Sequence, residues 1–96
     1  MRFVGAQLVH QATPAIPLGV GSKIRTDVRI DVSVDIDSTG KPTGAHVVSA
    51  KGEAAGLLAF EALKAARLSR FLPARQNDAP VASQAVITFV FAPGRY

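Results

Sequence analysis

The feature that most constrains the fold is a strict alternation of apolar and polar side chains between residues 24 and 37. The apolar positions are Ile24, Val28, Ile30, Val32, Val34 and Ile36. The residues between them are Arg25, Asp27, Arg29, Asp31, Ser33, Asp35 and Asp37, and Thr26 is the one polar residue on the apolar side. Successive side chains of a strand point to opposite faces of a sheet. The alternation therefore predicts a long strand with one buried face and one wet face.

The rest of the chain supplies partners for this strand. Residues 38–42 carry turn chemistry, with Gly40 able to take a positive φ, and a second extended run follows over residues 45–49, so we expect an antiparallel hairpin. Residues 53–70 are rich in Ala and Leu, and their apolar positions recur at helical spacing at Ala55, Leu58, Ala59, Ala62, Leu63 and Ala66. Pro73 follows the end of this helix, residues 76–80 read as a polar loop, and a last strand is predicted over about residues 82–91.

Together these elements predict an α+β fold with the order β-β-α-β. We expect a three-stranded antiparallel sheet with the spatial order second, first, third strand (2-1-3), and one helix packed on its apolar face. The third strand is then an edge whose free backbone groups can template another strand. Residues 1–23 precede this domain, which we place at residues 24–96. This lead-in is interpreted as a stretch with room for a short N-terminal helix, followed by a Pro- and Gly-rich extended segment.

Composition limits the chain to one small folded unit. It has 96 residues, of which 48% are hydrophobic and 19% charged, so it has enough apolar residues for one core and is unlike a disordered chain. No apolar run is long enough to span a membrane, and the N-terminus does not have the pattern of a signal peptide. The absence of cysteine excludes a disulfide framework, a zinc–thiolate site and a cysteine nucleophile.

No set of residues predicts catalysis, and we expect no enzyme activity, no catalytic residue, no metal ligand and no cofactor. His10 and His46 are far apart in the sequence, and the glycines form neither a P-loop nor a dinucleotide-binding motif. The acidic row Asp27, Asp31, Asp35 and Asp37 can be read as a cation or acid–base site or as a solvated strand face. The second interpretation is favoured because Arg25 and Arg29 interleave with the row.

The net charge of +4 raises the question of nucleic acid binding, because Lys64, Arg67, Arg70 and Arg75 crowd one segment. We do not expect nucleic acid to be a partner, because the wet strand face is acidic and poor in aromatic residues. Cations near a helix C-terminus also complement the helix dipole, which explains part of the cluster.

Read in order, these elements resemble the C-terminal domain of TonB-family energy transducers over about residues 11–91. The matching pieces are Pro14-Ala15-Ile16-Pro17, Val28 to Ile36, Asp37 with Gly40, Val47-Val48-Ser49-Ala50, Ala54 to Arg67, Phe71-Leu72-Pro73-Ala74, Pro80-Val81 and Phe89-Val90-Phe91. The chain is a divergent member of that pattern. Ile16 stands where the family usually has Tyr, Ser69 where Trp is frequent, and Val28 where a strand-opening Gly is common.

The resemblance implies a periplasmic module that binds the TonB box of an outer-membrane transporter by edge-strand addition. It implies transmission of energy derived from the proton-motive force, for uptake of a siderophore or another nutrient. The implied partners are TonB-dependent transporters and an inner-membrane, proton-driven stator complex, with an anchor to the inner membrane in a segment outside these 96 residues. Partner-binding residues are carried over to Thr13, Pro14, Ile16, Pro17, Ser83, Gln84, Ala85, Val86, Ile87, Thr88, Phe89 and Val90. Thr13 occupies the place of a family Gln that touches the box.

Two alternatives stay open for the exposed edge strand. The domain can serve as a TonB-like interaction or regulatory module outside transport, or two copies can form a homodimer through this edge or by domain swapping.

Overall fold

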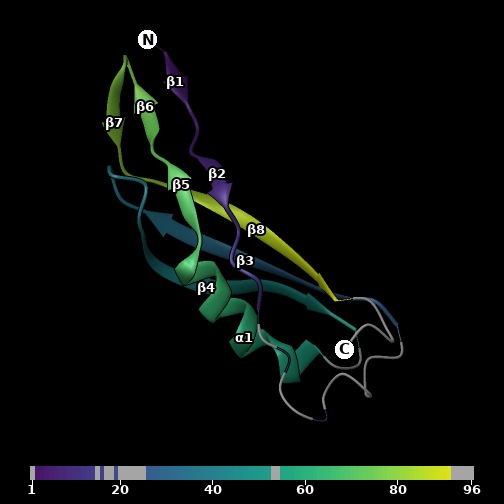
Figure 1. Ribbon diagram of the computed structural model, residues 1–96. Helices are drawn as coiled ribbons and strands as arrows, with labels where there is room; N and C mark the ends of the chain where they lie inside the picture. Colours follow the sequence, from purple (N-terminus) through teal and green to yellow (C-terminus); the bar gives the residue numbers. More distant parts are fainter. Residues whose placement is uncertain (1, 15, 17–18, 20–25, 53–54, 92–96) are drawn as a thin grey trace.

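The computed structural model describes residues 2–14, 16, 19, 26–52 and 55–91, and Figure 1 shows the arrangement of their elements. The secondary structure consists of β1 (Phe3–Val4), β2 (Gln7–His10), β3 (Val28–Ile36), β4 (Pro42–Lys51), α1 (Ala55–Leu68), β5 (Arg70–Leu72), β6 (Ala74–Gln76), β7 (Ala79–Val81) and β8 (Ser83–Phe91). The predicted boundary between residues 23 and 24 lies outside the described residues.

The largest sheet has the order β4-β3-β8, and both pairings are antiparallel. The even-numbered side chains of β3 are fully buried and face α1, whereas its odd-numbered side chains lie on the open face. The helix contributes the buried Leu58, Ala62 and Ala66, and the two alanines let it approach the strands closely. The predicted α+β class and the antiparallel sheet are confirmed.

The hairpin between β3 and β4 has the predicted turn chemistry. Gly40 has a φ of 92°, and its N–H donates to the carbonyl oxygen of Asp37 at 3.0 Å. The Asp37 carboxylate accepts hydrogen bonds from the N–H and the hydroxyl of Thr39 and from the N–H of Lys41. These bonds hold the pKa of Asp37 below its ordinary value, with the Thr39 hydroxyl as the largest cause. The turn also docks on β5, because the Phe71 N–H donates to the Gly40 carbonyl oxygen at 3.2 Å.

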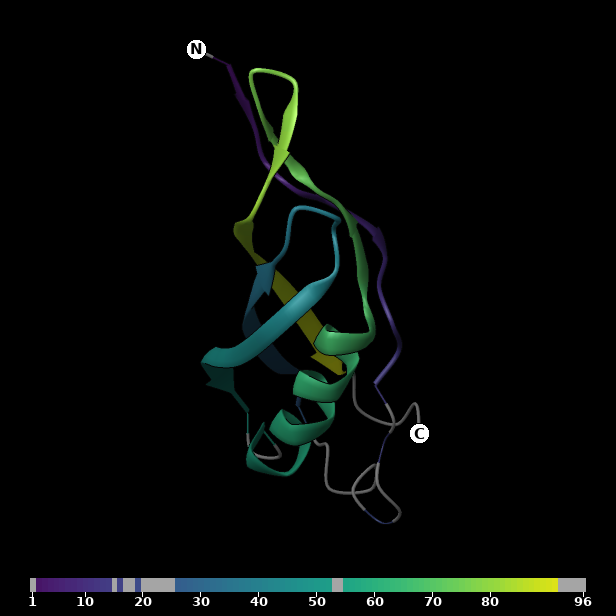
Figure 2. The same ribbon diagram turned by 90° about the vertical axis from the view of Figure 1, so that its left-hand side faces the viewer.

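The N-terminal residues differ from the sequence interpretation. The sequence allowed a short N-terminal helix, but residues 3–4 and 7–10 instead form β1 and β2. These strands pair antiparallel with β6 and β5, respectively. Every residue of the two strands is exposed. They are therefore held by backbone pairing with distant strands, which local sequence pattern cannot reveal. The result is an elongated molecule of 49 × 19 × 18 Å with an arm made of β1, β6 and β7 (Figure 2).

The prediction of a polar loop at residues 76–80 is also wrong. This segment forms a β-hairpin, in which β6 pairs antiparallel with β7. Asn77 and Asp78 have φ values of 51° and 70°, which fits a two-residue turn of type I′. Asn and Asp tolerate this left-handed region better than other residues with side chains. The Asn77 N–H also donates to the Arg2 carbonyl oxygen at 2.7 Å, so β1 is bound at the tip of the hairpin.

Ser69 connects the lead-in to the end of α1. Its side chain is fully buried, and its hydroxyl donates to the Ala65 carbonyl oxygen at 2.9 Å. The same hydroxyl accepts the N–H of Ala12 at 3.1 Å. A small hydroxyl residue therefore stands where the family pattern has Trp, and it places residues 11–14 beside the end of α1.

Candidate functional site

The candidate site is the outer edge of β8. In the part of the chain that the structure describes, β8 pairs only with β3, so its other side carries unpaired backbone groups. Val86 and Val90 are each 59% exposed on the open face of the strand. A strand edge without charge, with exposed β-branched residues, is the kind of surface onto which another strand adds.

The direction of the free backbone groups follows from the register of β3. Asp37 directly follows β3, and its N–H donates to the carbonyl oxygen of Lys41, which directly precedes β4. Because backbone groups of successive strand residues point to opposite sides, the odd-numbered residues of β3 turn theirs toward β4. Even-numbered residues then turn theirs toward β8, where each lies opposite an odd-numbered residue, from Val28 opposite Phe91 to Ile36 opposite Ser83. The register with β8 has no shift. It follows that Gln84, Val86, Thr88 and Val90 direct their N–H and C=O groups to the outer edge.

Side chains of the open sheet face fix β8 on β3. The Thr88 hydroxyl donates to Asp31 Oδ1 at 2.6 Å, and Gln84 Nε2 donates to Asp35 Oδ1 at 2.8 Å. The hydrogen bond from Thr88, followed by the charge of Arg29, lowers the pKa of Asp31, against the opposing effect of partial desolvation. Two of the four acidic residues of the row thus hold the edge strand in place. Val86 and Val90 are left as its exposed outer side chains.

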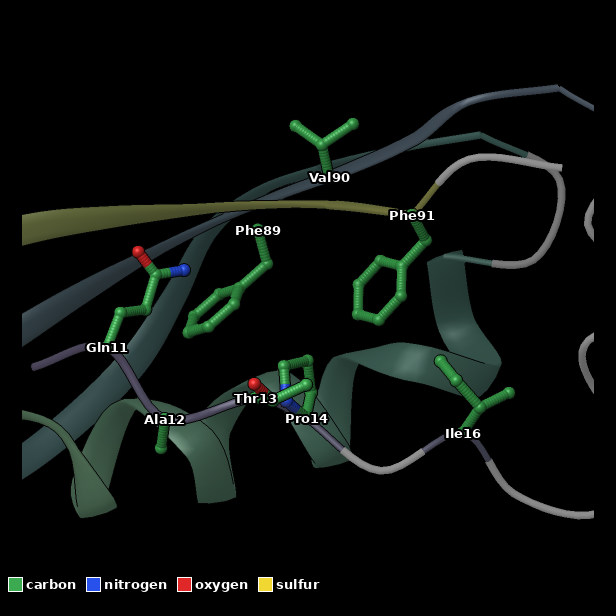
Figure 3. A pocket seen from close by; sticks show the side chains of 8 residues that line it. All are labelled: Gln11, Ala12, Thr13, Pro14, Ile16, Phe89, Val90 and Phe91. Atoms are coloured by element: carbon green, nitrogen blue, oxygen red, sulfur yellow. The ribbon is translucent and has the colours of Figure 1, made fainter. Parts of the chain in front are cut away.

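A groove runs between the lead-in and the C-terminal half of β8 (Figure 3). It has a volume of about 270 Å³ and is lined by Gln11, Ala12, Thr13, Pro14, Ile16, Phe89, Val90 and Phe91. The rings of Phe89 and Phe91 point toward residues 12–14, whereas the side chain of Val90 lies on the other side of the strand. The floor of the groove is therefore aromatic, and one wall is a polar and Pro-containing segment held by Ser69.

The structure brings some of the predicted partner-binding residues together and separates others. Thr13, Pro14 and Ile16 lie in the groove with Phe89 and Val90. Residues 83–88 continue along the same strand but lie outside the groove; among them Ala85 and Ile87 face the helix side, with Ile87 buried. Pro17 lies outside the described residues.

Three groove residues were not among the predicted ones. Phe91 continues the alternation of Ile87 and Phe89, so the period of the strand could have identified it. Gln11 places an amide in the groove two residues before Thr13, the position to which the family's Gln was assigned. Ala12 was not predictable, because its place depends on the hydrogen bond to Ser69.

The described residues contain no group of three or more His, Asp or Glu side chains arranged to hold a metal ion. No described helix is long and apolar enough to cross a membrane. The basic residues near the helix end are all exposed: Lys64, Arg67, Arg70 and Arg75. Lys64 pairs with Glu61 at 3.5 Å.

Comparison with known proteins gives one family. Residues 22–93 match the family model described as the C-terminal domain of the Gram-negative bacterial TonB protein. A search of curated proteins gave no match. The matched range includes the whole β4-β3-β8 sheet and α1 but not the lead-in residues that line the groove.

Proposed function

The chain belongs to the TonB C-terminal family, a family of periplasmic domains, and from this premise we propose that it is a non-enzymatic module that binds the TonB box of outer-membrane transporters. The bound segment adds as a strand along the outer edge of β8. The observation that carries the proposal is the row of backbone N–H and C=O groups at Gln84, Val86, Thr88 and Val90.

The edge is prepared for this role by its neighbours. Thr88 and Gln84 are bonded to the acidic residues of β3, so the strand does not have to be ordered when the segment binds. Alternate side chains of an added strand would lie toward the helix side, where Phe89 and the groove provide apolar contact. The main-chain hydrogen bonds supply affinity, and the groove between the lead-in and β8 supplies selectivity.

We also propose that the domain transmits force derived from the proton-motive force, through the lead-in. A load applied at the N-terminal side meets β1 and β2, which are paired with β6 and β5, and then the bond between Ala12 and Ser69. These contacts connect the lead-in to β5, β6 and the end of α1. The bond between Phe71 and Gly40 then links β5 to the turn of the sheet that carries β8. The proposal requires a longer chain that is anchored to the inner membrane and contacts a proton-driven stator. An antibody to this domain, used on fractionated source cells, tests for that chain.

The binding experiment compares two substitutions at one position of the edge. Val86→Pro removes an outward N–H and adds a ring at the edge, whereas Val86→Thr keeps the N–H and the β-branched shape. We expect Val86→Pro to weaken binding of a synthetic TonB-box peptide from a transporter of the source organism at least about tenfold, since one main-chain bond is lost and its neighbours are displaced. Val86→Thr should bind like the wild type.

Calorimetric titration measures the affinity, and thermal unfolding shows that each variant is folded. Proline is tolerated where the N–H faces outward on an edge strand, so the melting temperature of Val86→Pro should fall by only a few degrees. Equal binding by the two folded variants would refute edge-strand addition. Absence of any binding by the wild-type chain to peptides from the organism's own transporters would refute the TonB-box proposal itself.

A further inference from the structure

The outer side of α1 carries an apolar stripe that neither the fold nor the edge site uses. Leu57 is 49% exposed, and Phe60 and Leu68 are each 64% exposed. They lie on the exposed side of the helix, opposite the side that carries the buried Leu58, Ala62 and Ala66. The helix itself lies at the surface of the molecule (Figure 2). The outer side of a surface helix is normally polar, so an apolar stripe on it indicates a contact surface.

Four residues along this side of α1 have the spacing of a seam between two paired helices. Leu57, Glu61, Lys64 and Leu68 follow one another at intervals of four, three and four residues, which is the spacing of alternating a and d positions in a heptad. Phe60 and Arg67 flank the seam on one side, at equivalent positions seven residues apart. Glu61 lies at the border of the exposed side, with a side chain that is 16% exposed, whereas the side chain of Lys64 is 53% exposed.

This seam is complementary to a second copy of itself in the antiparallel orientation. If a two-fold axis passes between Glu61 and Lys64, Leu57 meets Leu68 of the second copy, and Glu61 meets Lys64 of the second copy. The flanking Phe60 then lies near Arg67 of the second copy, an arrangement in which a guanidinium stacks on an aromatic ring. Charge and apolar area are complementary at each of these positions.

The existing contacts within one helix support this geometry. Lys64 Nζ lies 3.5 Å from Glu61 Oε2 and 5.6 Å from the centre of the Phe60 ring, so the ammonium group already lies in the middle of the stripe. A second copy would share each ammonium group between two carboxylates. We propose that the outer side of α1 is a self-association surface, through which two copies of this chain form an antiparallel helix pair around a two-fold axis.

This dimer leaves the proposed binding edge available. The helix packs over β3 and β4, on the side of the sheet away from the outer edge of β8. One helix of 14 residues offers a small contact area. We therefore expect a weak, reversible dimer that forms at protein concentrations on the order of 100 μM.

Charge reversal at the centre of the seam tests the proposal. Glu61→Lys places only positive charges at the central positions of a homodimer, and Lys64→Glu places only negative ones there. Each single variant should weaken self-association at least about tenfold in sedimentation equilibrium. An equimolar mixture of the two variants brings opposite charges together again, so it should form a heterodimer of at least wild-type stability.

The mixing experiment separates association from folding, because both single variants lose the same intrahelical ion pair and only the mixture restores the intermolecular ones. Val86→Pro serves as a control for pairing through β8 and should leave the helix dimer unchanged. A wild-type chain that stays monomeric up to about 1 mM would overturn the proposal. So would a dimer that Val86→Pro dissociates, or one that the two single variants form as well as the wild type does.

Discussion

A buried hydroxyl, that of Ser69, bonds the lead-in to the end of α1, and its removal should have a measurable effect on stability. Ser69→Ala deletes the bond to the Ala65 carbonyl oxygen and leaves the N–H of the half-buried Ala12 without its partner. Leaving a buried donor unpaired costs about 1–3 kcal/mol, and the lost bond itself adds roughly 1 kcal/mol. Ser69 is fully buried, so little of this loss is recovered from water. We expect the free energy of unfolding to fall by about 2–4 kcal/mol.

Ser83→Ala is the matched control, because the same substitution should have the opposite sign there. The Ser83 hydroxyl is buried and has no hydrogen-bond partner among the described residues. Its removal relieves an unpaired polar group, so stability should stay the same or rise by about 1 kcal/mol. Urea unfolding followed by circular dichroism measures both variants, and hydrogen exchange should show faster exchange at Ala12 in Ser69→Ala alone. A destabilisation by Ser69→Ala no larger than that by Ser83→Ala would refute the reasoning.

Two further substitutions test the hairpin turn and the helix. A Cβ on Gly40, which has a φ of 92°, would clash with the Phe71 carbonyl oxygen, so Gly40→Ala should lower the urea midpoint markedly. Gly56→Ala, with nothing within 4 Å of the added Cβ, should raise stability by about 0.5–1 kcal/mol. A decrease of the same size in both variants would contradict this assignment. The lowered pKa of Asp37 gives stability that is present above its unfolded-state value and is lost as the pH falls through the folded-state value. The urea midpoint should therefore fall as the pH drops below the ordinary pKa of an aspartate, and Asp37→Asn should flatten that pH profile; an unchanged profile would show that Asp37 does not contribute.

The elements that could be predicted are those whose sequence pattern matches their burial. The alternation in β3 separates its fully buried even-numbered residues from the open face, so both the strand and its orientation follow from the sequence. The Ala- and Leu-rich run predicts α1, because the helix period and the buried positions coincide. The helix ends at Leu68, slightly before the predicted end, and β5 lies between it and Pro73. Gly40 in the turn is likewise a local property, since it depends on the positive φ that glycine permits.

The small strands could not be predicted, because pairing rather than burial defines them. All residues of β2 are exposed, and its register with β5 is irregular between Leu8 and His10, so no hydrophobic period marks it. The hairpin at Asn77 and Asp78 has turn residues, but its strands are three residues long and one contains Pro80. The same limit applies to the groove, where Ala12 is placed by a contact with Ser69, 57 residues away in sequence.

The exposed edge is the feature that the rest of the fold does not explain. Natural sheets usually protect such strands with Lys, Pro or an irregularity in the register. Residues 83–91 contain neither a charge nor a proline, and β8 pairs with β3 without a register shift, whereas both irregularities of the sheet lie in the pairing of β3 with β4. The lead-in lines the groove only near Phe89 to Phe91, so the backbone groups of Gln84 and Val86 are left without this neighbour. An edge that is fixed by bonds from Thr88 and Gln84 and yet left unprotected carries a risk of aggregation, and the proposed binding of an extended segment supplies a physical reason to keep it.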